Sequence, residues 1–360
     1  MRKIFSYIIL LLAAISCEKQ QGEEFDSVNR PDPQPCETIT FSIEVPSTKA
    51  YSGIDAQEIS VSNPTFLAFN SNGDLLARQT KSSGLLCSMV LPYGEVTLRF
   101  FCNVTPALFN DVCHISQLDE LVYNYYDSPF YKNGFLPMSG SYSLKVDGDV
   151  SKLHTITLER YHSRFCLLDI TNRLNLSHQE GLPMTVKAVY LTNVQGSVFI
   201  PGDRNTDLWY SKFGRPDDSQ TEEDRIDNGE GLVTGSQTFC AFDDVLENGR
   251  TLDMSSSPVK FYAFPNHSKH DCSGWMDTFI ERQTRMVLAA EIKGVVYYYP
   301  VNLVNLRRNT TYDVSFVITR LGSLDPDSFI FVDEDVLDVD KDVTIDFGGF
   351  DDGGDITIVF

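Results

Sequence analysis

The sequence predicts an all-β protein of two antiparallel β-sandwich domains, with one or two short helices. Runs rich in β-branched and aromatic residues recur along the chain, and in many of them apolar and polar side chains alternate, as in half-buried strands. Turn-forming segments such as Asn70–Asp74 and Pro92–Glu95 separate these runs at short spacing. Strands do not alternate regularly with long helical patterns, which disfavours a parallel, doubly wound sheet. At a prior of about 150 residues per domain, the chain is long enough for two domains.

The N-terminus has the pattern of a secretory signal peptide. Arg2 and Lys3 form a short basic start, and an apolar run covers residues 4–14. This run is too short for a spanning helix, which needs about 20 apolar residues. Small residues precede Cys17, as in a bacterial lipobox, although Ala14 stands where leucine is usual. We therefore expect Cys17 to be lipidated; the alternative is an ordinary signal peptide with an incidental cysteine.

The expected organisation has four parts. Residues 1–17 form the signal peptide and residues 18–36 a polar, proline-punctuated tether. The N-terminal sandwich covers residues 37–160 and the C-terminal sandwich residues 161–360, with candidate donor strands at its end.

The first strand after the tether shows the clearest alternation. Its apolar positions alternate with threonine, serine and glutamate, and the turn-forming segment Pro46–Gly53 ends the pattern. The apolar positions are Ile39, Phe41, Ile43 and Val45.

One helix is expected in the N-terminal domain. Ser116 stands at a capping position, with Ile115 before it and Asp119 three places on. The apolar residues at helical spacing are Leu118, Leu121, Val122 and Tyr125. Strands are expected on either side of the helix and throughout the second domain. They are 66–69, 85–91, 96–104, 165–170, 186–191, 259–264, 286–292, 295–301 and 312–319.

The C-terminus carries two further amphipathic segments joined by the glycine-rich segment Gly348–Gly354. Their apolar positions are Val343, Ile345 and Phe347, then Ile356, Ile358 and Phe360. Such strands either complete their own sandwich or are offered to a neighbour, because strand addition needs backbone bonds and alternate apolar side chains. The pattern leaves both alternatives open.

Charge and cysteine content exclude some classes of function. A net charge of −21 disfavours nucleic acid and anionic membrane surfaces as partners, so contact with a membrane is expected only through the lipid. The cysteines beyond Cys17 show no disulfide framework, although a Cys87–Cys102 bridge is conceivable.

No catalytic motif is recognisable, so we assign no catalytic residues, no metal and no cofactor. Three clusters have a plainer explanation as structure. The spacing of His267, His270 and Cys272 suits a metal, but a fourth ligand is missing and a polar loop is favoured. Alternating aspartates at 338–342 lack the glycine and glutamate of a calcium loop. The aromatic runs 209–210 and 297–299 are more typical of a core than of sugar-stacking platforms. The polar segment Gly202–Gly235 is expected to be a loop, and a loop of this length is usually either functional or mobile.

An ordered set of motifs resembles the fimbrillins of the Bacteroidales, the lipoprotein-derived subunits and accessory proteins of pili. The set extends over most of the chain, and its members are Leu136–Gly140, Thr157–Tyr161, Leu306–Val314, Ser323–Asp327 and Phe350–Phe360. Phe350 stands where tryptophan is frequent in the family.

The resemblance implies a fold and a mechanism. Two transthyretin-like sandwiches are expected, with the N-terminal strand completing the first. A trypsin-like surface protease would cut after Lys49, the strand would leave, and the C-terminal strands of another subunit would replace it. Family proteases often prefer arginine, and Lys49 departs from that preference. The leaving strand carries Ile39, Phe41, Ile43 and Val45.

The implied function is that of a structural pilus subunit serving adhesion, not an enzyme. Expected partners are other fimbrial subunits, the processing protease and a host surface protein or glycan. The expected location is the outer membrane, as a surface-exposed lipoprotein, and the fimbrium after processing. The alternatives are a fimbrial anchor or tip adhesin, and a surface glycan-binding lipoprotein.

Overall fold

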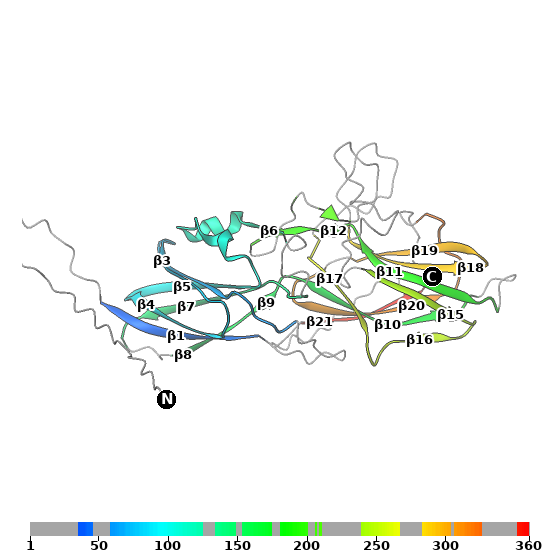
Figure 1. Ribbon diagram of the computed structural model, residues 1–360, viewed down its shortest axis with the longest axis horizontal. Coiled ribbons are helices and arrows are strands. Elements are labelled where there is room, and N and C mark those ends of the chain that lie inside the picture. Colours follow the sequence, from blue (N-terminus) through cyan, green and yellow to red (C-terminus); the bar gives the residue numbers. More distant parts are fainter. Residues whose placement is uncertain are drawn as a thin grey trace, which may run out of the picture. The chain divides into compact units, whose positions relative to one another are not determined.

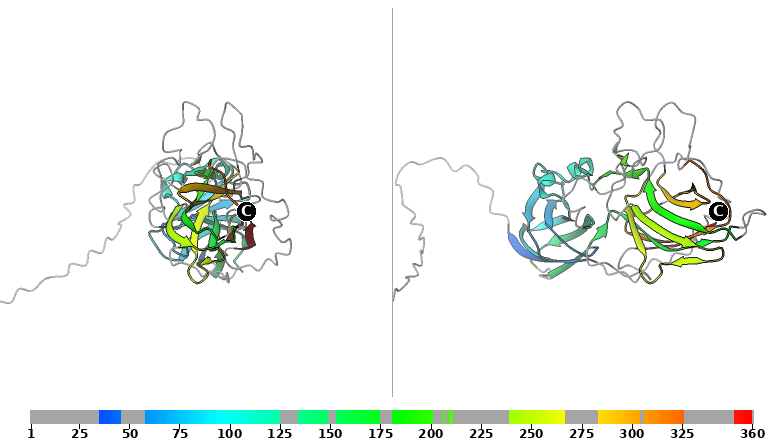
Figure 2. Two further views of the ribbon diagram at one scale, coloured as in Figure 1. Left: turned by 90° about the vertical axis from the view of Figure 1, so that its right-hand side faces the viewer. Right: turned by 45° about the vertical axis from the view of Figure 1, so that its right-hand side comes forward.

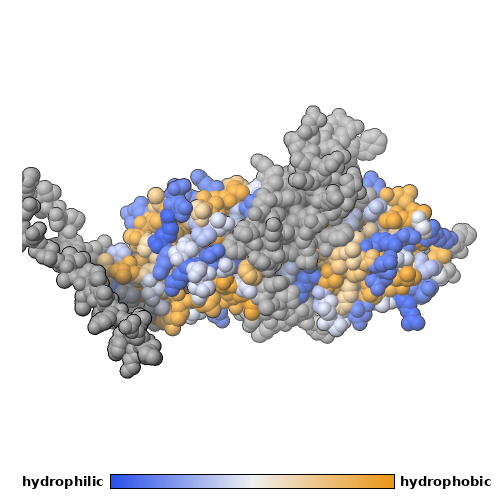
Figure 3. Space-filling view, viewed as in Figure 1, coloured by the Kyte–Doolittle hydropathy of each residue, from blue (hydrophilic) through white to orange (hydrophobic). Residues whose placement is uncertain are grey.

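The computed structural model shows an all-β chain whose residues 36–360 form one compact unit (Figure 1). It describes residues 35–45, 58–124, 134–148, 153–174, 181–200, 206, 209–210, 239–266, 283–303, 306–325 and 351–359. In this part of the chain, no helix has the length and apolar character needed to cross a membrane. Polar and apolar residues are interspersed on the face shown in Figure 3.

The first group of strands forms a sandwich of two sheets. A three-stranded sheet has the order β4-β1-β8, and a five-stranded sheet has the order β3-β2-β5-β7-β9. The strands of the small sheet are β1 (Cys36–Glu44), β4 (Leu86–Pro92) and β8 (Leu153–Thr157). Those of the large sheet are β2 (Thr65–Asn70), β3 (Leu75–Thr80), β5 (Gly94–Cys102), β7 (Met138–Val146) and β9 (Glu159–Arg160).

One apolar core fills this sandwich because alternate residues of each strand point inward. Phe41 of β1 packs edge-on against Phe100 of β5, with ring centroids 6.1 Å apart, and Phe66 of β2 packs on the same ring at 5.0 Å. All three side chains are fully buried. The strand β1 therefore supplies part of the core, and does not merely border it.

The second group of strands also forms two sheets. One has the order β16-β10-β20-β21, with β17 also paired to β10, and the other has the order β15-β11-β18-β19. The right-hand view of Figure 2 shows them as curved layers. The first sheet comprises β10 (Ser163–Asn172), β16 (Thr251–Asp253), β17 (Val259–Ala263), β20 (Thr310–Ile318) and β21 (Asp351–Val359). The second comprises β11 (Met184–Thr192), β15 (Phe239–Leu246), β18 (Arg285–Ile292) and β19 (Val295–Asn302).

Most strand pairs are antiparallel, as expected, and the all-β prediction is confirmed. Among the described strands, three pairs are parallel, which a purely antiparallel sandwich would not contain: β1 with β8, β10 with β20, and β20 with β21. The strand pairing changes between β9 and β10: β9 pairs with β7 of the first sandwich, whereas β10 pairs with β17 and β20 of the second group. Since residues 36–360 form one compact unit, a division into two domains after residue 160 stays a prediction.

The predicted helix is shorter than expected and begins differently. It is a 3₁₀ helix, η2 (Ile115–Glu120), that His114 caps: its Nδ1 accepts a hydrogen bond from the Ser116 amide at 3.2 Å. Ser116 is therefore inside the helix and does not cap it. The chain after it forms β6 (Val122–Asn124), which pairs with β13 (Ser197–Phe199), and this long-range pairing overrides the local helical spacing.

Three further elements complete the described part. A 3₁₀ helix, η1 (Pro106–Phe109), precedes η2. β12 (Val194–Gln195) pairs with β14 (Trp209–Tyr210).

The conceivable Cys87–Cys102 bridge does not form. Both thiols are free and buried, and they lie on strands that do not pair with each other: Cys87 is opposite Phe41 and Cys102 is opposite Met138. Burial raises the pKa of Cys87 to about 11 and that of Cys102 to about 12, so both are small apolar core residues.

Gly140 of β7 is needed for close packing inside the first sandwich. A Cβ at this position would lie 2.7 Å from the Thr157 carbonyl oxygen, which is backbone and cannot move aside easily. We expect Gly140→Ala to lower the free energy of unfolding by about 1–3 kcal/mol, as overpacking does. Urea unfolding is the measurement. The control is Ser143→Ala on the exposed face of the same strand, which should change stability by less than about 0.5 kcal/mol. Equal effects of the two substitutions would contradict the packing argument.

Candidate functional site

The strand β1 occupies the middle of the small sheet. It pairs antiparallel with β4, from Cys36 opposite Pro92 to Ser42 opposite Leu86. The Thr40 hydroxyl of β1 also lies 2.9 Å from the Ser88 hydroxyl of β4. On its other side, β1 pairs parallel with β8. Among the described strands, β1 is the sole sheet partner of both β4 and β8. Loss of β1 would therefore leave β4 and β8 with unpaired backbone groups on either side of an empty strand position, called the slot below.

The inward face of β1 is apolar and buried, as its alternation predicts. Ile39 and Phe41 are fully shielded from solvent, and Ile43 is 3% exposed. Val45, just beyond the strand, packs against the same core but is only partly buried. Because a buried aliphatic or aromatic side chain contributes about 1.5–3 kcal/mol, β1 supplies a large share of the stabilisation of the sandwich.

The C-terminal strand has its backbone partner within the same chain. β21 runs parallel to β20 at the end of its sheet, with Ile356 opposite Val314 and Ile358 opposite Phe316. This arrangement matches the alternative in which the last strand completes its own sandwich. The other predicted residues lie outside the described part: Cys17, Lys49, Val343, Ile345, Phe347 and Phe360.

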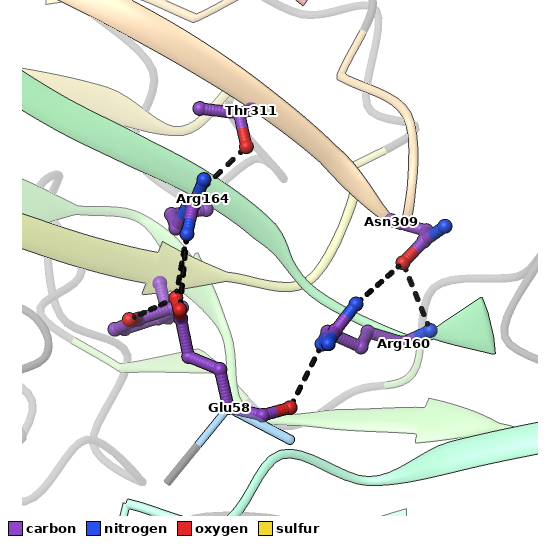
Figure 4. A network of polar contacts seen from close by, with 6 residues as sticks. Glu58, Arg160, Arg164, Asn309 and Thr311 are labelled. Atoms are coloured by element: carbon purple, nitrogen blue, oxygen red, sulfur yellow. Dashed lines mark hydrogen bonds and ion pairs between the residues drawn. The ribbon is translucent and has the colours of Figure 1, made fainter. Parts of the chain in front are cut away.

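A buried polar network begins at Glu58, just before β2 (Figure 4). Both carboxylate oxygens of Glu58 accept hydrogen bonds from Arg164 Nη1 of β10 at 3.0 Å. The Tyr262 hydroxyl of β17 donates to the same carboxylate at 2.6 Å. The side chains of Arg164 and Glu58 are 0% and 2% exposed, so water screens this ion pair little.

Arg160 extends the network to the loop before β20. Its Nε donates to the Glu58 carbonyl oxygen at 3.0 Å, and its backbone amide donates to Asn309 Oδ1 at 3.3 Å (Figure 4). Burial lowers the pKa of Arg160 to about 10, an effect that the nearby Glu58 charge opposes, so the guanidinium stays charged at neutral pH. Arg164 Nε also donates to Thr311 Oγ1 at 3.1 Å. The network thus joins the backbone before β2 to β9, β10, β17 and β20.

Sequence reasoning found part of this network through its motifs. Arg160 and Asn309 belong to the quoted motifs, but the pattern gave no role to Glu58 or Arg164. A buried charge pair between residues 106 positions apart has no local signature.

The other clusters considered from sequence carry no chemistry in the described part of the chain. No group of three or more histidine, cysteine, aspartate or glutamate residues there is placed to hold a metal. His267, His270, Cys272 and the aspartates at 338–342 lie outside it, as does nearly all of Gly202–Gly235. Tyr299 is a core residue, as expected, and its hydroxyl donates to the Arg320 carbonyl at 3.1 Å.

Comparison with known proteins supports the fold. No family model and no curated protein matches the chain. Among solved structures, a fimbrilin (FimA) from Porphyromonas gingivalis W83 is similar, with a TM-score of 0.54 and 12% identity over 81% of this chain and 92% of that one. A "putative cell adhesion protein" from Bacteroides eggerthii has a TM-score of 0.53 and 16% identity over 82% and 93%. One of the same description from Parabacteroides distasonis has a TM-score of 0.54 and 13% identity over 82% and 96%. At these identities, the comparison shows a shared all-β fold.

Proposed function

We propose that the chain is the precursor of a structural subunit of a cell-surface pilus. In this proposal, Cys17 carries the lipid that holds the precursor at the outer membrane. A trypsin-like protease cuts after Lys49 and releases β1. The C-terminal strand residues of another subunit, 343–347 or 356–360, then fill the slot, and the resulting fibre serves adhesion.

The observation that carries the proposal is the position of β1. The first strand of the described chain lies between β4 and β8, contributes buried side chains to the core, and is followed within a few residues by Lys49. Removing it would open an apolar groove flanked by two unpaired strand edges. Strand addition fills such a groove, because the edges bind backbone and the pockets bind alternate side chains.

The fold comparison supports the same class of function. Structures that share the fold include one named a fimbrilin and others named for cell adhesion, which are structural roles and not enzymatic ones. A fimbrial anchor or tip adhesin is the second candidate, because β21 already pairs with β20 of its own chain. An anchor would retain β1, and a tip protein would not donate its C-terminal strands.

Limited trypsin digestion tests the proposal. The folded chain without its signal peptide is expected to be cut first after Lys49 and then to form a ladder of oligomers, followed by intact mass and by gel mobility without heating. Lys49→Gln should remain uncut and monomeric. A chain lacking residues 343–360 should be cut at the same place and stay monomeric.

Two results would separate the candidates. If the intact chain is cut after Lys49 and stays monomeric, the stalk subunit is excluded and a tip role follows. If trypsin cuts elsewhere first and leaves β1 in place, the strand-exchange mechanism is wrong for this chain.

A further inference from the structure

A cavity of about 470 Å³ lies against the face of the five-stranded sheet that points away from β1. Arg99 and Phe101 of β5 reach it from one strand, and Ser141 and Ser139 are their direct partners on β7. Directly paired residues share a face of the sheet, so these four side chains are presented together. The helix η2 and Arg308 complete the wall. The volume is within the range of small-molecule sites, about 300–1,000 Å³.

The cavity contains an arginine that has no partner in the described part of the chain. Arg99 Nε is shielded from solvent yet donates no hydrogen bond to any described residue. A nearby arginine is used differently: Arg78 of β3 donates to the carbonyls of Asn110 and Val112, both at 2.7 Å. Arg308, also in the wall, pairs with Glu159 at 2.8 Å. Since buried polar groups are nearly always bonded, the unsatisfied Nε–H of Arg99 points to a ligand.

We propose that this cavity binds a saccharide that carries a carboxylate, such as a uronic acid residue. The planar guanidinium of Arg99 matches a carboxylate in geometry and charge. The hydroxyls of Ser139 and Ser141 stand beside it and both donate and accept hydrogen bonds.

The remaining walls suit the hydroxyls and the ring of a sugar. The carboxylates of Asp119 and Glu159 lie in the same wall and can accept hydrogen bonds from ligand hydroxyls. Phe101 and Leu118 supply apolar surface for the C–H face of a ring. Glu159 already pairs with Arg308 at 2.8 Å, but a carboxylate keeps further lone pairs for a ligand hydroxyl. The ligand is thus acidic at one position and rich in hydroxyls elsewhere.

The test is a titration of the folded, uncleaved chain with glucuronic acid and with its methyl ester, followed by ligand-observed NMR. The ester keeps the ring and its hydroxyls but removes the charge. We expect the acid to bind at least tenfold more tightly than the ester. In Arg99→Gln this difference should fall to less than threefold. Because binding is measured on the intact precursor, the result does not depend on fibre assembly.

Lys145→Gln is the matched control. Lys145 lies on the same face of β7, four residues beyond Ser141 and outside the cavity, and its substitution changes the net charge equally. It should preserve the difference between acid and ester. If Arg99→Gln does not fold, the unaltered protein can be titrated at low and at high ionic strength instead. Its affinity for the acid should fall as the ionic strength rises, and its affinity for the ester should not. Equal binding of acid and ester, or binding of a C-terminal peptide carboxylate but no sugar, would overturn the proposal.

Discussion

Glu58→Ala is expected to lower the free energy of unfolding by about 3–5 kcal/mol, because it leaves a buried charge without its partner. Arg164 is fully buried, and both carboxylate oxygens of Glu58 accept its hydrogen bonds. The substitution also removes the acceptor of the Tyr262 hydroxyl. Urea unfolding measured by tryptophan fluorescence and by circular dichroism would give the change in stability.

An exposed ion pair provides the control for this prediction. Asp243 pairs with Lys187 at 3.1 Å, but its side chain is 86% exposed. Because solvent screens such a pair, Asp243→Ala should cost no more than about 1 kcal/mol. Similar losses for Glu58→Ala and Asp243→Ala would show that the buried network does not hold its segments together.

The local pattern of the sequence identified strands and their inward faces correctly. The two-residue alternation from Ile39 to Ile43 matches the buried positions of β1, because one face of a strand meets the core and the other does not. The sequence could not identify the neighbours of β1. β8 lies more than one hundred residues downstream, and its parallel pairing depends on the whole sandwich.

Long-range contacts also explain what sequence reasoning missed. The helical spacing that begins at Leu118 is real, but pairing of β6 with β13 takes the chain into a strand after residue 121. Glu58 and Arg99 have unremarkable neighbours in sequence. Glu58 becomes notable only because folding buries it against Arg164, and Arg99 only because it lies in a cavity without a described partner.

The largest effect is expected from removal of β1. Deleting residues 36–45 removes three buried apolar side chains, Ile39, Phe41 and Ile43, which together contribute about 5–9 kcal/mol. A whole domain is stable by only about 5–15 kcal/mol, so the deletion should bring the first sandwich close to unfolding. We expect a fall in melting temperature, measured by circular dichroism, together with increased binding of a dye that reports exposed apolar surface.

A synthetic peptide of residues 36–45 should reverse this loss. It binds the folded slot and not the unfolded chain, so the melting temperature should rise with peptide concentration. A peptide with Phe41→Asp places a charge at a fully buried position and should give no rise, whereas Thr38→Glu alters an exposed position and should rescue nearly as well. This contrast separates insertion in register from non-specific binding. If the deletion costs little, or both variant peptides act alike, β1 is not a replaceable part of the core. Rescue by the native and Thr38→Glu peptides, but not by the Phe41→Asp peptide, would establish that the slot accepts a strand from outside the chain, which is the physical requirement for assembly by strand exchange.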